Sequence, residues 1–197
     1  MKRSSPAKTN ALARLPPGVF TLEDAAGIGL GRYLIYRLVD AGDVIQLERG
    51  VFQNPKSAIS PEDIQLAAAC TYFGPESWIG GLTALFRYGL IEQVPTKIWI
   101  LVPPHVKRAG PIYRIIHTKL DPRIAVTRHC YYRIANVDRA IVEALRYATK
   151  IGLSTAIRAA REAIKSGQTS DAKISKTARD LGLQRFVLRH WDAIIVE

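Results

Sequence analysis

The sequence predicts an α+β protein in two parts: a small N-terminal part of helices and a hairpin, and a larger part that mixes strands and helices. Three observations predict this. Segments with helical patterns, broken by glycines, precede two short strand-like runs before residue 56. Residues 97–134 are rich in β-branched and aromatic side chains, which favour strands. From Val137 onward, apolar residues recur at helical spacing.

The N-terminal part begins with a basic stretch. We expect residues 1–8 to form a basic tail. A short helix capped by Thr9 or Asn10 would follow, and it would end at Arg14 because prolines and a glycine come next in the chain.

Residues 9–56 then show the order helix, turn, helix and hairpin. Thr21 is a good N-cap for a short helix, and Asp24 three residues later forms a weak capping box. Glycines mark the turn that follows, and a longer helix runs to about Ala41. Two apolar runs then flank Glu48-Arg49-Gly50 as strands flank a hairpin turn. This order predicts a winged helix-turn-helix domain.

The second part is expected to span residues 61–197. Ser60 and Pro61 mark a strong helix start, and Gly74 ends that helix. We expect a second helix around residues 81–88 and then a small sheet, with helices after it. The expected strands are residues 97–102, 112–117, 124–127 and 131–134.

The longer helix of the N-terminal part has a face that can contact nucleic acid. Leu34, Ile35 and Leu38 lie on one side of it and predict a buried stripe. Residues on the other side would face the major groove of DNA, and arginines there can bind guanine edges. Basic residues of the tail would add contacts to phosphates. The candidate DNA-binding residues are Arg32, Tyr33, Tyr36, Arg37, Arg49, Lys2, Arg3 and Lys8.

The composition agrees with a protein that binds nucleic acid. The 197 residues carry a net charge of +11, and residues 144–197 are the richest in basic excess. A positive field of this kind attracts phosphate groups, although a basic surface can also serve solubility alone. No apolar run approaches the length of a membrane span, and no secretory signal is seen. We therefore expect a cytoplasmic protein that does not bind a membrane.

The C-terminal helices carry further basic side chains. These side chains form either a solvated face or a second nucleic-acid surface, for DNA or RNA. Residues of this possible second basic surface are Arg158, Arg161, Lys165, Lys173, Lys176 and Arg179.

No catalytic, metal-binding or cofactor-binding signature is found in the sequence. The two cysteines, Cys70 and Cys130, are far apart, and Cys70 is expected to be a core residue. His117 and His129 fall on expected strands and could face each other, but such histidines are more often structural. We therefore predict no enzyme, no metal and no cofactor.

Several short motifs follow one another in a fixed order along the chain. The hairpin ends in an Arg-Gly-Val-aromatic step at residues 49–52. Residues 89–95 match Gly-Leu-Thr-Glu-Gln-x-Pro, with Ile91 in place of threonine, and a strand with prolines follows at 97–104. Later come Arg139-Ala-Ile-Val-Glu143, which matches Arg-Thr-Ile-x-Asp, and Lys150-Ile-Gly-Leu-Ser-Thr-Ala156, which matches Lys-Ile-Gly-Leu-x-x-Ala. In this order the segments resemble the AbiEi family, the antitoxins of type IV toxin-antitoxin and abortive-infection systems.

The resemblance implies two activities. The winged helix would repress its own operon by binding inverted repeats in the promoter, which are double-stranded DNA. Residues 61–197 would act as an antitoxin domain against a partner nucleotidyltransferase toxin, without forming a stable complex with it. Two other interpretations stay open. The chain could be a winged-helix regulator unrelated to a toxin, sensing a ligand through residues 97–134, or an enzyme that acts on nucleic acid.

Overall fold

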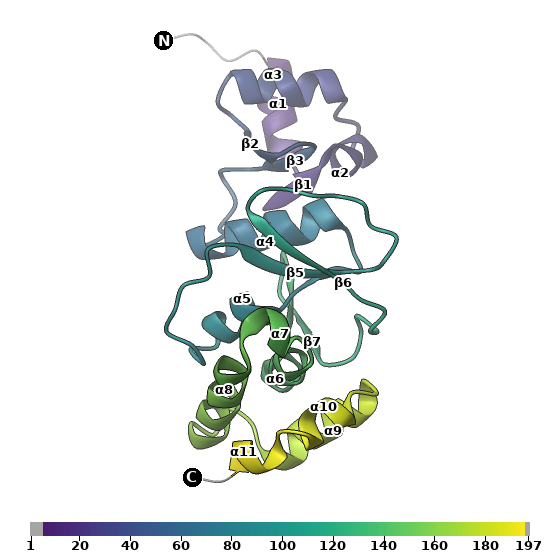
Figure 1. Ribbon diagram of the computed structural model, residues 1–197. Coiled ribbons are helices and arrows are strands. Elements are labelled where there is room, and N and C mark those ends of the chain that lie inside the picture. The colour runs from purple at the N-terminus through teal and green to yellow at the C-terminus, as the bar shows by residue number, and fades with distance from the viewer. Residues whose placement is uncertain (1–5, 196–197) are drawn as a thin grey trace. The chain divides into compact units, whose positions relative to one another are not determined.

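The computed structural model describes residues 6–195, with side chains from residue 10 onward, and confirms the predicted α+β class. The chain divides into two compact units (Figure 1). Unit 1 ends at Gly74, and unit 2 begins at Pro75. Each unit contains its own sheet and its own helices.

Unit 1 has the order of elements that defines a winged helix. Its three strands form an antiparallel sheet in the order β1-β3-β2, in which β2 and β3 are the hairpin that we predicted. The elements of unit 1 are α1 (Pro6–Arg14), β1 (Val19–Thr21), α2 (Leu22–Gly27), α3 (Arg32–Asp40), β2 (Ile45–Glu48), β3 (Val51–Gln53) and α4 (Pro61–Phe73).

Helix α1 begins earlier than the sequence analysis predicts. We expected residues 1–8 to form a tail, but the helix begins at Pro6 and includes residues 6–8. Proline suits the first turn of a helix because the amide hydrogen that it lacks has no partner there. The helix is held in place by Ala11 near its end and Leu15 just after it, which are both buried in the core of unit 1.

The core of unit 1 is made of apolar side chains. Phe20 of β1 stacks on Phe52 of β3, with 5.8 Å between the ring centroids. Ile35 and Leu38 of α3 are buried in the same cluster. This packing holds α3 against the sheet by one face and leaves its other face outside the core.

Two of the predicted helix caps are confirmed in unit 1. The Thr21 hydroxyl accepts a hydrogen bond from the Asp24 amide at 3.1 Å, and the Asp24 carboxylate accepts one from the Thr21 amide at 2.7 Å. The Ser60 hydroxyl accepts from the Asp63 amide at the start of α4. We expected α4 to open the second part of the chain, but it packs against β1, β2 and β3 and groups with unit 1.

Unit 2 contains a mixed five-stranded sheet in the order β6-β5-β4-β8-β7. Strands β5 and β6 are parallel, as are β4 and β8, while β4–β5 and β7–β8 are antiparallel. The strands are β4 (Trp78–Ile79), β5 (Ile98–Val102), β6 (Tyr113–His117), β7 (Val126–Arg128) and β8 (Arg133–Ala135). The helices are α5 (Gly81–Arg87), α6 (Val137–Arg146), α7 (Ala148–Ile151), α8 (Leu153–Lys165), α9 (Asp171–Asp180), α10 (Gln184–Leu188) and α11 (Trp191–Ile195).

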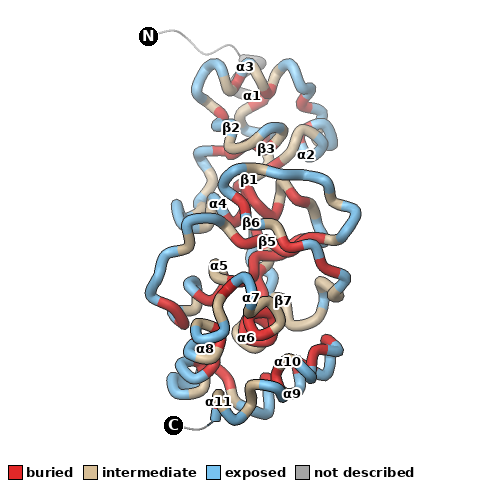
Figure 2. The backbone as a smooth tube through the Cα atoms, viewed as in Figure 1, coloured by how far each residue is buried: buried red, intermediate tan, exposed pale blue. Residues whose placement is uncertain are grey.

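Helix α6 is the central helix of unit 2. It packs against α5, α8, α9 and α10, and Figure 2 shows it as largely buried. Its core side includes a charged pair, because Arg139 Nε donates a hydrogen bond to Glu143 Oε1 at 2.7 Å and both side chains are fully buried. Trp78 Nε1 donates to the same oxygen at 3.1 Å. Unit 2 therefore has a polar group at the centre of its packing.

Within residues 6–195, no helix is long and apolar enough to cross a membrane.

Candidate nucleic-acid interface

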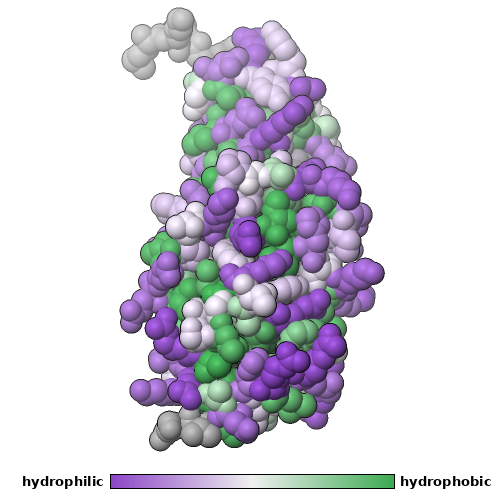
Figure 3. Space-filling model, viewed as in Figure 1, coloured by the Kyte–Doolittle hydropathy of each residue, from purple (hydrophilic) through white to green (hydrophobic). Residues whose placement is uncertain are grey.

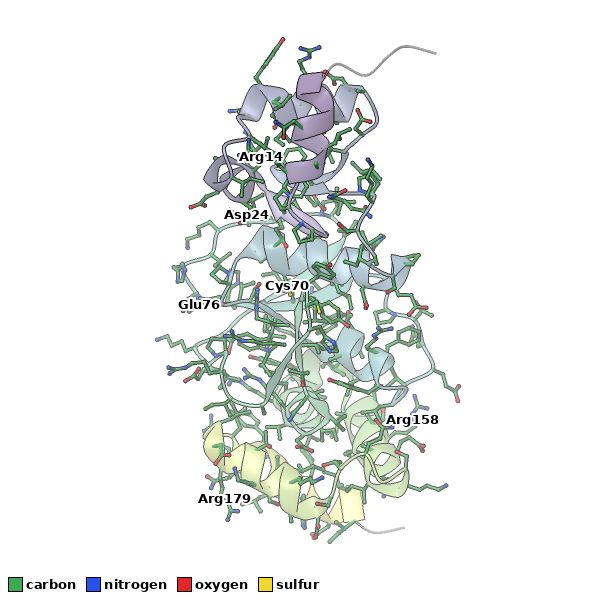
Figure 4. The ribbon with its side chains drawn as sticks, turned by 180° about the vertical axis from the view of Figure 1, so that it is seen from behind. Arg14, Asp24, Cys70, Glu76, Arg158 and Arg179 are labelled. Atoms are coloured by element: carbon green, nitrogen blue, oxygen red, sulfur yellow. The ribbon has the colours of Figure 1, made fainter. Side chains whose placement is uncertain are left out.

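The tight turn between α2 and α3 fixes where α3 begins. Gly29 adopts φ +78°, a left-handed conformation that glycine accepts without strain, and Leu30 is buried directly after it. The Arg14 side chain (Figure 4) donates a hydrogen bond from its guanidinium to the carbonyl of Ile28. Arg14 was not among the predicted site residues. Its role is to hold the turn that presents α3.

The outward face of α3 carries basic and aromatic side chains. Arg32, Tyr33 and Arg37 are exposed, and Tyr33 keeps 77 % of its surface accessible. The guanidinium carbon of Arg37 lies 5.9 Å from the centroid of the Tyr33 ring, one helical turn away. These three predicted site residues are thus brought together on one exposed face.

Tyr36 departs from the prediction. We expected it to point away from the core, but it is half-buried and its ring packs edge-on against Phe52 at 5.7 Å between centroids. The aromatic ring gains contacts with the core that a more exposed position would not give. Arg32 lies over the same ring, with 5.5 Å between its guanidinium carbon and the Tyr36 centroid. The Tyr36 ring therefore contacts both Phe52 in the core and the guanidinium of Arg32.

The hairpin supplies one more exposed basic residue. Arg49 sits in the turn between β2 and β3 and is exposed, and Gly50 beside it adopts φ +80°. A shift in strand pairing lies just before the turn, between Gln46 and Glu48. Arg49 is therefore presented at the tip of the hairpin, as the sequence predicts.

Acidic side chains limit which part of α3 can approach DNA. Asp40 is the last residue of α3 and is exposed, while the basic residues Arg32 and Arg37 lie earlier in the helix. Because a carboxylate repels phosphate, Asp40 would disfavour contact between the C-terminal end of α3 and a nucleic acid. Hydrophilic side chains, with hydrophobic ones among them, cover the face of unit 1 drawn in Figure 3.

The basic residues of the predicted tail are not placed by the structure. Lys2 and Arg3 lie outside the described residues, and Lys8 is described only as part of the α1 backbone. Their contacts with phosphate stay a prediction.

The basic residues of the C-terminal helices are exposed, but they belong to two helices. Arg158, Arg161 and Lys165 lie on α8, and the other three lie on α9. Figure 4 shows Arg158 and Arg179 on opposite sides of unit 2. Arg161 Nε also donates a hydrogen bond to the carbonyl of Ala193 at 2.8 Å. The six residues therefore form one cluster on α8 and one on α9, and their contact with nucleic acid stays a prediction.

The two histidines do not form a pair. His117 ends β6 and His129 follows β7, and these strands are the two opposite edges of the sheet in unit 2. A ring nitrogen of His117 bonds to the carbonyl of Val106, and the His129 ring stacks on Tyr132. The expectation that the two histidines could face each other was wrong, because the strands between them in the sheet keep them apart. Cys70, in contrast, is buried in α4 as expected.

The order of elements, the antiparallel sheet and the exposed basic helix together define a winged helix-turn-helix protein with a second α+β unit. Residues 8–55 match the model of a family described as "Transcriptional regulator, AbiEi antitoxin". Residues 8–55 are thus similar to the AbiEi transcriptional regulators, and this match confirms the resemblance over that segment. This is not a family of enzymes.

The fold also resembles a solved structure. The crystal structure of the RV2827C protein from Mycobacterium tuberculosis superimposes with a TM-score of 0.58 at 16 % sequence identity. The match covers 94 % of this chain and 78 % of that one. At this identity the likeness shows a shared fold and nothing about function. No curated protein matches this chain.

Proposed function

We propose that this protein is a transcriptional repressor that binds inverted repeats in the promoter of its own operon. The observation that carries the proposal is the exposed group of Arg32, Tyr33 and Arg37 on α3, within the segment that matches a family of transcriptional regulators. A helix of this kind enters the major groove with its N-terminal residues toward the bases. Arg32 and Tyr33 lie in the first turn of α3, and Arg37 lies in its last turn on the same exposed face.

The residues of α3 can read sequence as well as bind phosphate. Arg32 and Arg37 can each donate two hydrogen bonds to the O6 and N7 atoms of guanine, which discriminates against other bases by about 1–3 kcal/mol per contact. Arg49 at the hairpin tip would contact the DNA backbone or the minor groove. Such a contact adds affinity without reading the sequence.

The second part of the proposal is that the protein acts as an antitoxin against a nucleotidyltransferase toxin. It rests on the family match, since the family model is described as an antitoxin regulator. We assign this activity to unit 2, and we propose that it needs no stable complex with the toxin. The regulatory and antitoxin activities would then depend on different residues.

The repressor proposal is tested with Arg32→Ala combined with Arg37→Ala in a gel-shift assay on the protein's own promoter. The double variant should lose the preference for the promoter over random duplex, because both base-reading side chains are gone. The matched control is Lys107→Ala combined with Lys150→Ala, which removes the same charge from exposed positions of unit 2. A double variant that keeps the preference, or a control that loses it, contradicts the proposal.

The antitoxin proposal is tested in cells by co-expression with a nucleotidyltransferase encoded beside this gene. Wild-type protein should restore growth when the toxin is induced. The Arg32→Ala and Arg37→Ala variant should restore growth equally well while failing to repress a promoter fusion. A failure of the wild type to restore growth favours a regulator unrelated to a toxin.

A further inference from the structure

A small hollow in unit 2 gathers three cationic side chains around a tryptophan. Its volume is about 200 Å³. This is below the roughly 300–1,000 Å³ of sites for drug-sized ligands, so it suits a small ligand or one group of a larger ligand. The lining comes from α5, β5, β6, α7, α8 and the segment before β5, and its cations are Lys97, Arg114 and Arg158.

No carboxylate lines this hollow. Within the described part of the chain, none of its three cations forms a salt bridge, and all three are exposed. Positive charge gathered in a concave site, with no acid in its lining, concentrates the field that attracts an anion. The electrostatics of the hollow therefore favour a ligand with negative charge.

The floor of the hollow is held in a fixed position. Trp99 of β5 is buried, and its amide donates a hydrogen bond to the Thr83 hydroxyl at 2.8 Å. Gly81 lies so close that a Cβ atom added to it would be 2.4 Å from the indole ring. Arg114 is stacked over Trp99, with its guanidinium carbon 5.7 Å from the ring centroid. The arginine is thus positioned by contacts that leave its N–H groups free to donate.

Neutral polar side chains complete the lining. Gln93, Thr96 and Thr155 add an amide and two hydroxyls to the three cations. A phosphate monoester carries a charge of about −1.5 to −2 near neutral pH and has three strong acceptor oxygens. A carboxylate carries only one charge and two oxygens. Three cations with several neutral donors therefore match a phosphate better than a carboxylate.

A second, larger hollow of unit 2 also contains basic residues, but it is less suited to an anion. Glu76 and Asp121 are part of its lining. Arg123 is held by Asp121 through a salt bridge of 2.7 Å, and hydrogen bonds from Arg123 lower the pKa of Asp121 to about 2. The charge there is partly neutralised, whereas the charge around Trp99 is not.

We propose that the hollow formed by Lys97, Trp99, Arg114 and Arg158 binds the phosphate group of a small phosphorylated molecule. The arginines would donate paired hydrogen bonds to its oxygens, and Lys97 would add a point charge. This gives unit 2 a ligand site that is separate from the DNA-reading face of α3. The site does not depend on the antitoxin proposal.

The proposal is tested by calorimetric titration of the full-length protein, in a phosphate-free buffer, with inorganic phosphate, ribose 5-phosphate and AMP. We expect saturable binding of at least one of these ligands at one site. Arg114→Gln and Arg158→Gln should each weaken that binding by about tenfold or more, since a hydrogen bond to a charged group is lost. Binding of all three with equal affinity indicates recognition of phosphate alone, and tighter binding of AMP indicates that the nucleoside contributes.

Lys165→Gln is the matched control, because it removes one charge from the same helix as Arg158 without lining the hollow. It should bind like the wild type. Circular dichroism of each variant checks that the fold is kept. Absence of binding to all three ligands, or an equal loss in Lys165→Gln, overturns the proposal.

Discussion

Helices α3 and α6 are of similar length and each carries arginine and acidic residues, but they place them in opposite environments. In α3 the arginines are exposed and the core side is apolar. In α6 the core side contains Arg139 and Glu143, both fully buried. The difference shows that arginines of one chain can have different roles. Those of α3 are exposed and available to a ligand, whereas Arg139 is buried and contributes to the packing of unit 2.

The contacts of Arg139 show its structural role. Its guanidinium lies over Trp78, with 4.2 Å between the guanidinium carbon and the ring centroid. It also donates to the carbonyls of Asp121 and Ile124. Burial raises the pKa of Glu143 above its ordinary value, although Arg139 and the Trp78 N–H act in the opposite direction. Arg139 thereby links helix α6, the Trp78 indole and the loop before β7.

The largest expected effect comes from breaking the buried pair in α6. Glu143→Ala leaves the buried Arg139 Nε and Trp78 Nε1 without their shared acceptor, which should lower the free energy of unfolding by about 3–5 kcal/mol. Hydrogen exchange measures this loss in the amides of α6, and the amides of α3 should keep their protection. If the α6 amides of Glu143→Ala stay as protected as those of the wild type, the pair does not stabilise unit 2.

Glu143→Gln is the control for this variant, and it gives a dependence on pH. Glutamine imitates the protonated carboxyl, so it should lose less stability than alanine. The pKa of Glu143 is higher in the folded than in the unfolded protein. The stability that the protonated carboxyl contributes is therefore fully present below about pH 4.5, the ordinary pKa of a glutamate, and is lost as the pH rises through the folded pKa. Urea unfolding at a series of pH values should show the wild type losing stability relative to Glu143→Gln as the pH increases from about 4.5 through the folded pKa. The opposite trend would contradict the raised pKa.

In unit 1 the comparable destabilising variant is Ile35→Ala, which creates a cavity in the core. Ile35 is fully buried between α3 and the sheet, so Ile35→Ala should lower the stability by about 2–5 kcal/mol. The exposed face of α3 would lose its support, and DNA binding should weaken with it. Urea unfolding followed by DNA titration measures both losses. A loss below about 1 kcal/mol would show that α3 does not depend on this packing.

The capping box at Thr21 gives a smaller effect. Thr21→Ala removes the hydroxyl that accepts from the Asp24 amide, which should cost about 1 kcal/mol. The loss should be visible in urea unfolding while binding to the promoter is kept, because Thr21 is not on α3. Thr21→Ser is the control, since serine keeps the hydroxyl.

The smallest effect on stability is expected on the exposed face of α3, where we propose that DNA binds. Tyr33 is 77 % exposed, so Tyr33→Ala should change the stability by about 0.5 kcal/mol or less. It should still weaken binding to promoter DNA, which fluorescence anisotropy can measure. A variant with unchanged DNA binding would remove Tyr33 from the interface.

The sequence alone predicted the parts of the fold that depend on local chemistry. The N-cap residues Thr21 and Ser60 and the hairpin around Arg49 follow from interactions between near neighbours in the chain, and the structure confirms them. Strand β4, of only Trp78 and Ile79, could not be predicted, because two residues are too few to show an alternating pattern.

The parts that were missed depend on contacts between distant residues. The spacing of Arg139 and Glu143, four residues apart among apolar residues of the same helix, was a visible signal of a buried pair, but Trp78 lies far from them in the sequence. Tyr36 was placed outward because helical spacing alone does not show that Phe52 of the hairpin receives its ring. Likewise, the cations around Trp99 come from three separate segments that only the tertiary fold brings together.

The central claim is that α3 reads a specific DNA sequence. It is tested most directly by fluorescence anisotropy of the wild-type protein with its own promoter and with a scrambled duplex of the same length and composition, over a series of salt concentrations. Affinity for both should fall as salt rises, because phosphate contacts release counterions. The promoter should stay tighter at every salt concentration, since hydrogen bonds to the bases are kept. Equal affinity for the two duplexes would contradict the claim.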